Sequence, residues 1–427
     1  MDAAESRRPR IAVWAYTCNP ERGSDRGATW AYVRALGRDA DLTVFHSPED
    51  APELRRWSQQ NPTAPIDFVE VPEPPWIAFV HRGFGVHRQL EFVTYAAWLR
   101  DAVRTTRERL AFGSFDAVAH ASFSNYWLPS PVWKLGLPSL WGPIGGGVRT
   151  PLRLWPSLGL GGVIAEVERT LALTVAAALP ATRRTQRRVT APIVETVETR
   201  DRLTRWRRND AVLVNRVALI DPQTAGADVA PEAASVRRST EFLFTSSLWG
   251  KKGARLALEA LVHADPRAHL AFVNDGYEQP YLERSARRLG VDHRVSFEGR
   301  IPREELFARM RGAAGLIFTG LREEGGLALA EAMYQGLPAV VLAHGGAGLI
   351  ARQATDPRRV RAVEPGGRRQ TAVRLGRAMT ELIASAPAER SPTLNPGPHL
   401  EGITAALAIA LPWTSHRGAV RESLPCS

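Results

Sequence analysis

The sequence predicts an α/β protein built from two doubly wound domains. Short apolar segments alternate with amphipathic helical segments from residue 10 to residue 143, and the same alternation starts again at residue 240. Strands that alternate with helices indicate a parallel sheet covered on both faces. A chain of 427 residues is also long for one hydrophobic core. We therefore expect two Rossmann-like domains that face each other across a cleft.

The composition of the chain places the boundaries of these domains. Residues 222–239 are rich in proline, alanine, glycine and serine, which is typical of a linker. We assign residues 1–221 to an N-terminal domain and residues 240–399 to a C-terminal domain. Residues 400–427 then form a C-terminal helix and tail.

Each domain has its own series of expected elements. Apolar segments bounded by turn residues indicate strands, and segments with apolar residues at helical spacing indicate helices. The expected strands are 10–16, 42–46, 115–123 and 137–143 in the first half, and 240–248, 268–275, 294–299, 314–320 and 338–343 in the second. The expected helices are 29–38, 254–264, 280–290, 303–313 and 327–336. In such sheets, ligands bind beyond the carboxyl ends of the strands.

Charge and cysteine content restrict the classes of function. The two cysteines lie at opposite ends of the chain, which excludes a disulfide framework and fits a reducing, cytoplasmic compartment. The polar opening residues do not resemble a signal peptide. Glutamates and an arginine interrupt the most apolar segment, 158–180, so it does not fit a membrane-spanning helix.

The net charge of +11 comes largely from residues 182–208, which contain nine arginines. This cluster fits a solvated helical face or a peripheral contact with an anionic membrane, at its inner face. Aromatic residues are not interleaved with the arginines at stacking spacing, and no nucleic-acid-binding module is recognisable. We therefore expect no nucleic-acid partner.

The segment REEGGLALAEAMYQGLP, residues 322–338, carries the strongest indication of a binding site. An expected strand runs into a loop with two glutamates and two glycines, and a helix follows directly. Glycines allow close approach of the backbone, and the N–H groups at a helix start suit an anion such as a diphosphate. Ionised carboxylates only accept hydrogen bonds, so hydroxyl groups are their natural partners. A sugar nucleotide offers both groups, although acids that merely favour a helix N-terminus remain an alternative.

Several motifs extend this interpretation to a family. Glu323 and Glu331 are separated by seven residues, and this spacing resembles the E-x7-E motif of the retaining GT-B glycosyltransferases of the large GT4 family (glycosyltransferase group 1 type). FLFTSSLWGKKG (242–253) is similar to the family's GRLxxxKG segment, VNDG (273–276) to its VGDG, and FEGRIPREEL to its FxGxvpxxel. In the first half, PERGSDRGATW and WGPIGGG resemble loops of one subset of these enzymes. The resemblance covers approximately residues 10–350.

The resemblance implies roles for residues of the C-terminal half. Lys252 would bind the donor diphosphate, Glu331 would hold the ribose hydroxyls, and Glu323 would contact the donor sugar. The doubled acid leaves open whether Glu323 or Glu324 does this. The sequence contains only three lysines, so a compact ammonium at a phosphate site is a notable choice. In the alternative interpretation, Lys251 and Lys252 are exposed charges of a loop and bind no ligand. Backbone N–H groups around Gly325, Gly326 and Leu327 would meet the phosphates or the sugar.

The resemblance also implies roles in the N-terminal half. His120 ends an expected strand, and the family places a histidine there that faces the donor sugar and the acceptor. A lone histidine can equally be structural. Gly23, Ser24 and Gly27 would form a loop that faces the donor phosphates and the acceptor.

One position departs from the family pattern. Ser247 stands where the family carries an arginine, and serine cannot supply the charge of a guanidinium fork. Lys251 lies four positions further on and could compensate. We predict a retaining, metal-independent glycosyltransferase of hexose-type sugars, with no cofactor apart from a nucleotide-diphosphate sugar as donor and with a glycan, lipid-linked or small-molecule acceptor. The alternative, motivated by Ser247, is a catalytically impaired sugar-nucleotide-binding scaffold protein.

Overall fold

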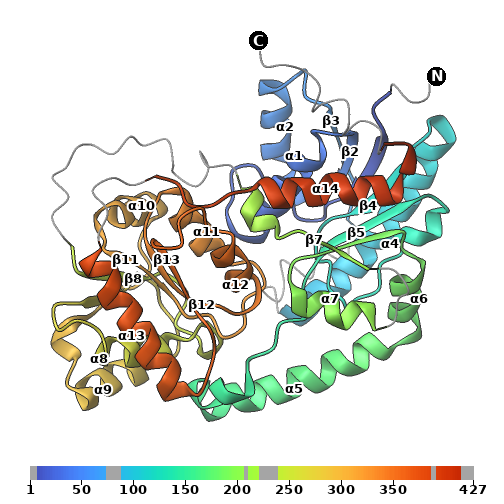
Figure 1. Ribbon diagram of the computed structural model, residues 1–427. Coiled ribbons are helices and arrows are strands. Elements are labelled where there is room, and N and C mark those ends of the chain that lie inside the picture. Colours follow the sequence, from blue (N-terminus) through green and yellow to red (C-terminus); the bar gives the residue numbers. More distant parts are fainter. Residues whose placement is uncertain (1–6, 74–87, 206–209, 221–238, 386–390, 415–427) are drawn as a thin grey trace. The chain divides into compact units, whose positions relative to one another are not determined.

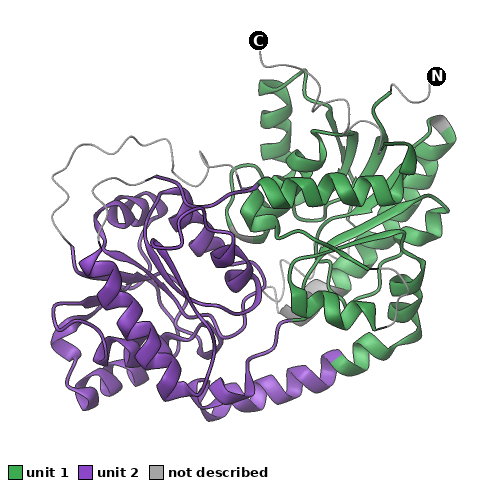
Figure 2. Cartoon of the chain, viewed as in Figure 1, with its two compact units in different colours: residues 1–147, 174–219, 397–427 green, residues 148–173, 220–396 purple. Residues whose placement is uncertain are grey.

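The computed structural model describes residues 7–73, 88–205, 210–220, 239–385 and 391–414 (Figure 1). The predicted linker, except Ser239, and the tail after residue 414 lie outside the described residues. The chain forms two compact units (Figure 2). Unit 1 comprises residues 1–147, 174–219 and 397–427, and unit 2 comprises residues 148–173 and 220–396.

Unit 1 is built on a parallel sheet of seven strands in the order β3-β2-β1-β4-β5-β6-β7. Its strands are β1 (Arg10–Trp14), β2 (Asp41–His46), β3 (Ile66–Glu70), β4 (Ala117–His120), β5 (Ser139–Ile144), β6 (Ala191–Val194) and β7 (Val212–Leu213). Its helices are α1 (Ser24–Leu36), α2 (Ala51–Gln60), α4 (Arg88–Phe112), α6 (Pro180–Arg188), α7 (Val197–Thr204) and α14 (Gly397–Ala410). Short 3₁₀ turns cover Pro48–Asp50, Val132–Leu135, Arg216–Leu219 and Pro412–Thr414. The sheet order confirms the predicted doubly wound topology.

The C-terminal helix α14 packs on unit 1. Its buried residues Ile403, Ala406 and Leu407 belong to the same apolar cluster as the strands β1 and β2. The N–H of Asn215 also donates to Nδ1 of the buried His399, at 3.2 Å. A helix from the C-terminal part of the chain therefore completes the core of unit 1.

Unit 2 is built on a parallel sheet of six strands in the order β10-β9-β8-β11-β12-β13. The strands are β8 (Glu241–Phe244), β9 (His269–Phe272), β10 (Val295–Phe297), β11 (Gly315–Phe318), β12 (Ala339–Leu342) and β13 (Val360–Val363). The helices are α8 (Ala254–Val262), α9 (Gln279–Leu289), α10 (Arg303–Gly312), α11 (Leu327–Tyr334), α12 (Gly345–Arg352) and α13 (Arg368–Ala384). Short 3₁₀ turns cover Leu152–Ser157, Gly250–Lys252 and Asp292–Arg294.

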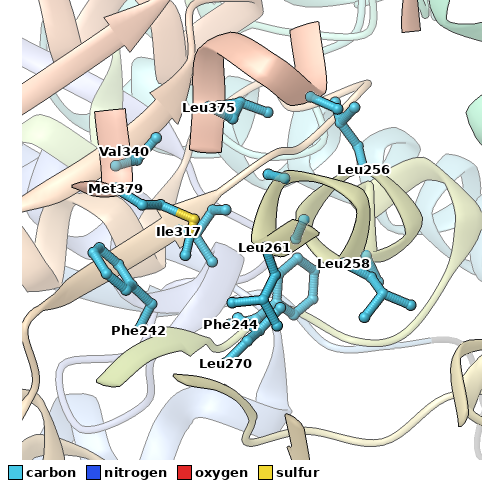
Figure 3. Packing of buried hydrophobic residues seen from close by; sticks show 14 of the residues in the cluster. Phe242, Phe244, Leu256, Leu258, Leu261, Leu270, Ile317, Val340, Leu375 and Met379 are labelled. Carbon is cyan, nitrogen blue, oxygen red and sulfur yellow. The ribbon is translucent and has the colours of Figure 1, made fainter. Parts of the chain in front are cut away.

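The core of unit 2 lies between its sheet and two helices. Figure 3 shows Phe244 and Ile317 of the sheet packed among side chains of α8 and α13, such as Leu261 and Met379. The strands consist of nearly continuous apolar runs because a parallel sheet is buried on both faces. The sheet order reverses between β8 and β11, and ligands of doubly wound sheets bind at such a switch point.

Residues 148–173 group with unit 2, although the sequence analysis placed them in the N-terminal domain. Leu154 and Leu158 belong to the core of unit 2, which explains the grouping. The chain then passes from unit 2 to unit 1 within helix α5 (Gly159–Ala178) (Figure 2). Within the described ranges, no helix combines the length and the hydropathy needed to cross a membrane.

Candidate functional site

A lysine–glutamate pair lies at the switch point of unit 2. Lys252 ends the loop after β8, and Glu323 lies in the loop after β11. Because β8 and β11 are neighbouring parallel strands, both loops emerge at the same edge of the sheet. The Lys252 Nζ donates to Oε2 of Glu323 at 2.5 Å, and both side chains are partly buried. The structure thus brings together two of the predicted site residues.

Backbone contacts hold the two loops against each other. The N–H of Leu321 donates to the carbonyl of Lys251 at 2.9 Å. Gly253 adopts φ +76°, and a Cβ at this position would lie 2.0 Å from the carbonyl oxygen of Thr319. The Thr319 hydroxyl in turn donates to the Gly253 carbonyl at 2.9 Å. Glycine therefore permits the close approach that places Lys252 beside Glu323.

Helix α11 begins at the same loop. Gly326 is its N-cap residue and adopts the left-handed conformation, with φ +91°. The first N–H groups of a helix have no partner within the helix, and the N-terminus carries a partial positive charge. The Lys252 ammonium and this helix start both suit an anion, and they belong to two loops that are hydrogen-bonded to each other.

Glu331 lies on α11 and pairs with an arginine that the sequence analysis did not single out. Arg303, the first residue of α10, donates to Oε1 of Glu331 at 2.6 Å. Burial raises the pKa of the Glu331 carboxyl, and the neighbouring Arg303 opposes this shift. The Arg303 guanidinium also lies 4.9 Å from the centre of the Phe307 ring. The segment FEGRIPREEL contained this arginine, but only the fold brings it to Glu331.

The second glutamate of the doubled acid has a different partner. Oε1 of Glu324 accepts the backbone N–H of Val148 at 2.9 Å. Its neighbour Arg322 pairs with the buried Glu166, which also accepts the N–H of Thr150 at 3.2 Å. Glu324 and Arg322 therefore hold the segment 148–173 on unit 2, whereas Glu323 is paired with the lysine.

Ser247, which stands in the place of the family's arginine, and Lys251, which could compensate for it, both lie in the loop after β8. The carbonyl of Ser247 accepts the N–H of Trp249 at 2.8 Å, within a tight turn. The Lys251 ammonium lies 5.2 Å from the centre of the Trp249 ring, a cation–π contact. Whether Lys251 compensates for Ser247 stays a prediction.

His120 ends β4 in unit 1, as expected, and is 2% exposed. Its Nε2 hydrogen-bonds with the Tyr95 hydroxyl, and its Nδ1 lies 2.7 Å from Oγ of Ser130. Since Tyr95 also donates to the Ser122 carbonyl at 2.9 Å, the consistent arrangement is a neutral ring with the proton on Nε2. Burial lowers the pKa of His120 to about 3. These contacts engage both ring nitrogens and argue against the catalytic role, which stays a prediction.

The predicted glycine loop of unit 1 forms the start of α1. Gly23 is the N-cap residue, and Ser24 is the first residue of the helix. Gly27 is required by packing, because a Cβ there would lie 2.3 Å from the carbonyl oxygen of Arg22. The buried Asp50 fixes the preceding loop by accepting the N–H of Cys18 at 2.9 Å. The contact of this loop with a donor stays a prediction.

Two of the buried histidines of unit 1, His120 and His399, should make the protein sensitive to mild acid. Burial also lowers the pKa of His399, to about 4. Both rings are neutral in the folded state, whereas in the unfolded state they bind a proton near pH 6.5. Their contribution to the free energy of unfolding is therefore fully present above pH 6.5 and is lost as the pH falls below it. We expect these two groups together to lower the free energy of unfolding by about 4 kcal/mol between pH 7 and pH 5. Urea unfolding at both pH values measures the loss, and His399→Gln should remove about half of it. An equal loss in this variant would contradict the assignment.

Comparisons with known proteins agree with this geometry. Residues 231–358 match the family described as Glycosyl transferases group 1. This range contains Lys252, Arg303, Glu323 and Glu331. It is less than a third of the chain. No curated protein matches the sequence.

Solved structures that resemble the chain share its fold at low sequence identity. Sucrose-phosphate synthase from Thermosynechococcus elongatus has a TM-score of 0.53 and 17% identity, with 98% of this chain and 100% of that chain covered. An E. coli protein described as trehalose-6-phosphate, bound with UDP-2-fluoro glucose, has a TM-score of 0.53 and 15% identity, with 97% and 99% covered. An α,α-trehalose-phosphate synthase (UDP-forming) from Burkholderia vietnamiensis has a TM-score of 0.50 and 13% identity, with 97% and 100% covered.

These likenesses assign the GT-B fold to the chain, with its two Rossmann-like domains. Residues 231–358 of unit 2 are similar to the glycosyl transferases group 1 family. The domain match and the fold together support a glycosyltransferase.

Proposed function

We propose that the protein transfers a hexose-type sugar from a nucleotide-diphosphate sugar to an acceptor, with retention of configuration and without a metal. The observation that carries the proposal is the pairing of Lys252 with Glu323 at the switch point between β8 and β11. Both residues lie in the segment that matches the glycosyltransferase family. The E. coli protein of the same fold, described as bound with UDP-2-fluoro glucose, supports a nucleotide sugar as the donor class.

The donor diphosphate would lie between Lys252 and the N-terminus of α11. An ammonium has three donor N–H groups, and the bond to Glu323 uses one of them. Lys252 can therefore bind phosphate oxygens while it still orients Glu323. The N–H groups that follow Gly326 would bind the other phosphate oxygens.

The carboxylates would hold hydroxyl groups of the donor. Glu323 would accept hydrogen bonds from the transferred sugar, and Glu331 from the ribose. The contact with Arg303 occupies Oε1 of Glu331, which leaves Oε2 for a hydroxyl. We assign no donor contact to Glu324, because its bond to the Val148 N–H makes it part of the attachment of the segment 148–173.

Transfer would break the bond between the anomeric carbon and the leaving phosphate while the acceptor oxygen bonds to the same face of that carbon. The acceptor proton would pass to the leaving phosphate oxygen. Lys252 and the α11 N-terminus would stabilise the negative charge on the departing diphosphate, in the place of a metal ion. Neither Glu323 nor Glu331 acts as a nucleophile in this scheme. The acceptor would be a glycan, a lipid-linked sugar or a small molecule.

Calorimetric titration with UDP-, GDP- and ADP-sugars tests the donor site. We expect one of these donors to bind to the wild type, and binding to be lost in Glu331→Ala because the ribose loses its acceptor. Glu305→Ala is the matched control, since Glu305 is an exposed acid of the neighbouring helix α10. Failure of every donor to bind would contradict the proposal, and so would equal binding by the Glu331 variant.

A pair of isosteric variants separates the two glutamates of the loop. Glu323→Gln should lower kcat/KM about a hundredfold, because it removes the negative charge that orients Lys252 and binds the sugar. Glu324→Gln should stay within a few-fold of the wild type, since the amide oxygen can still accept the Val148 N–H. Release of nucleoside diphosphate from the bound donor measures both rates. The opposite order of effects would assign the donor contact to Glu324.

A further inference from the structure

Helix α11 carries a single charged side chain, that of Glu331, in a buried position. Glu331 is 7% exposed, and its neighbours Ala330 and Ala332 are fully buried. Burial disfavours the charged form of a carboxyl, and a buried carboxyl without a partner binds a proton. The charged form is the better acceptor for hydroxyl groups, because a protonated carboxyl replaces one acceptor by an O–H donor. Glu331 therefore needs a nearby positive charge if it is to bind a ribose.

Arg303 supplies this positive charge from the neighbouring helix α10. Its Nη2 donates to Oε1 of Glu331 at 2.6 Å, and the Arg303 side chain is 38% exposed. The Phe307 ring, one turn further along α10, lies 4.9 Å from the guanidinium carbon and supports the arginine in this position. An opposite charge in direct contact favours the ionised carboxyl. Arg303 thus acts on Glu331 against the effect of burial.

The place of Arg303 in its own helix shows that the arginine gains from this partner. Arg303 is the first residue of α10, and the acids Glu304 and Glu305 follow it in the same turn. The N-terminus of a helix carries a partial positive charge, which favours acids there and disfavours an arginine. A residue that is locally unfavourable, but has a partner distant in the sequence, is typical of a functional position.

The other charged groups of the elements around α11 have contacts of their own. Five of the contacts are ion pairs, namely Arg309 with Glu241 and Glu298, Arg352 with Glu364, Arg361 with Glu381, Lys252 with Glu323, and Arg322 with Glu166. Three further groups bond to backbone atoms, namely Glu324, His344 and Arg359. Glu304, Glu305 and Arg311 of α10 are exposed. Within the ranges that the structure describes, the Glu331 carboxyl thus owes its charge compensation to Arg303.

We propose that Arg303 is a positioning residue for the donor nucleotide: its bond to Oε1 keeps the Glu331 carboxyl negatively charged and leaves Oε2 to accept the ribose hydroxyls. This inference rests on the proposed function, in which Glu331 binds the ribose. It also specifies the donor class, because a site that hydrogen-bonds hydroxyl groups rejects an analogue that lacks them. The donor would be a ribonucleotide, and its selection over a deoxynucleotide would depend on Arg303.

The pH dependence of the ribose preference tests the proposal in Arg303→Met, which keeps an apolar stem beside Phe307 and removes the charge. The probes are the nucleoside diphosphate whose sugar binds in calorimetry and its 2′,3′-dideoxy analogue. The ratio of their affinities reports the ribose contact, since both carry the same phosphates. We expect a constant ratio between pH 7 and pH 9 in the wild type. In Arg303→Met the ratio should be about tenfold lower at pH 7.

This lower ratio should recover towards the wild-type value at pH 9. Loss of the arginine raises the pKa of Glu331 further, and the charged form returns only as the pH rises through that pKa. Arg303→Lys keeps the charge and should restore the ratio at pH 7. Arg311→Met, at an exposed arginine of the same helix, is the matched control and should behave as the wild type. An equal reduction at both pH values would contradict the proposal, because Arg303 would then shape the site without holding the charge.

Titration of the glutamate carboxyls by ¹³C NMR provides a measurement that needs no ligand. Glu331→Gln identifies the signal, and its midpoint in Arg303→Met should lie about one pH unit or more above that of the wild type. If no nucleotide bound, the proposed function would fail, while the shifted midpoint would still show that the charge depends on Arg303. An unchanged midpoint would overturn the inference, even in a protein that binds its donor.

Discussion

Replacement of Lys252 by alanine is expected to lower kcat by about a hundredfold to a thousandfold. The loss of one preorganised charge that stabilises a leaving group typically has an effect of this size. The variant should still fold, because the Lys252 side chain is one-quarter exposed and its one described bond is to Glu323. Release of nucleoside diphosphate, with the donor that binds in calorimetry, measures the effect.

Lys251→Ala is the matched control for this experiment. Lys251 belongs to the same loop, but its ammonium lies over the Trp249 ring rather than beside Glu323. We expect its removal to change kcat only a few-fold. If the two variants were equally impaired, Lys251 would share the role that the missing arginine leaves open. If Lys252→Ala kept full activity, the proposed stabilisation of the diphosphate would be wrong.

Replacement of Gly253 by alanine should affect both stability and donor binding. The left-handed backbone costs alanine about 1–2 kcal/mol, and the new Cβ would meet the Thr319 carbonyl at 2.0 Å. Relief of that contact moves the loop that places Lys252. We expect a total loss of about 2–5 kcal/mol in the free energy of unfolding. Donor affinity should fall by about tenfold to a hundredfold, as for the loss of a charged hydrogen bond.

Gly290→Ala separates these two effects. Gly290 has nearly the same φ, +70°, but no atom lies within 4 Å of the position of its Cβ. Its substitution should therefore cost only about 1–2 kcal/mol and leave donor affinity unchanged. Urea unfolding and calorimetry on the two variants measure both quantities. Equal losses of donor affinity would refute the assigned packing role of Gly253.

The central strands of both sheets could be predicted because each is a short apolar run between turn residues. The segments 10–16 and 240–248 contain β1 and β8, the first strands of their sheets. The strands β3, β6, β7 and β13 were not predicted. β6 has only four residues and includes a proline, and β3, β7 and β13 are short strands at the edges of their sheets. Such edge strands depend on a neighbouring strand more than on their own composition.

The residues of the site could be predicted from the sequence, but the contacts between their side chains could not. The spacing of Glu323 and Glu331 and the loop position of Lys252 were available from the sequence. The contact of Arg303 with Glu331 was not, because 27 residues, which include most of α10 and the whole of β11, lie between them in the sequence. Likewise, adjacent identical side chains such as Glu323 and Glu324 cannot be told apart until the fold shows which neighbour each one meets.

The attachment of residues 148–173 has a consequence for any fragment of the protein. Unit 2 is assembled from two stretches that are far apart in the sequence, so no single continuous piece encodes it without residues of unit 1. A fragment that begins at residue 220 would expose the surface that Leu154 and Leu158 cover and would remove the partners of Arg322 and Glu324. A version of unit 2 that begins at residue 220 would therefore be incomplete, and joining 148–173 to it through a new connection is the rational way to isolate it.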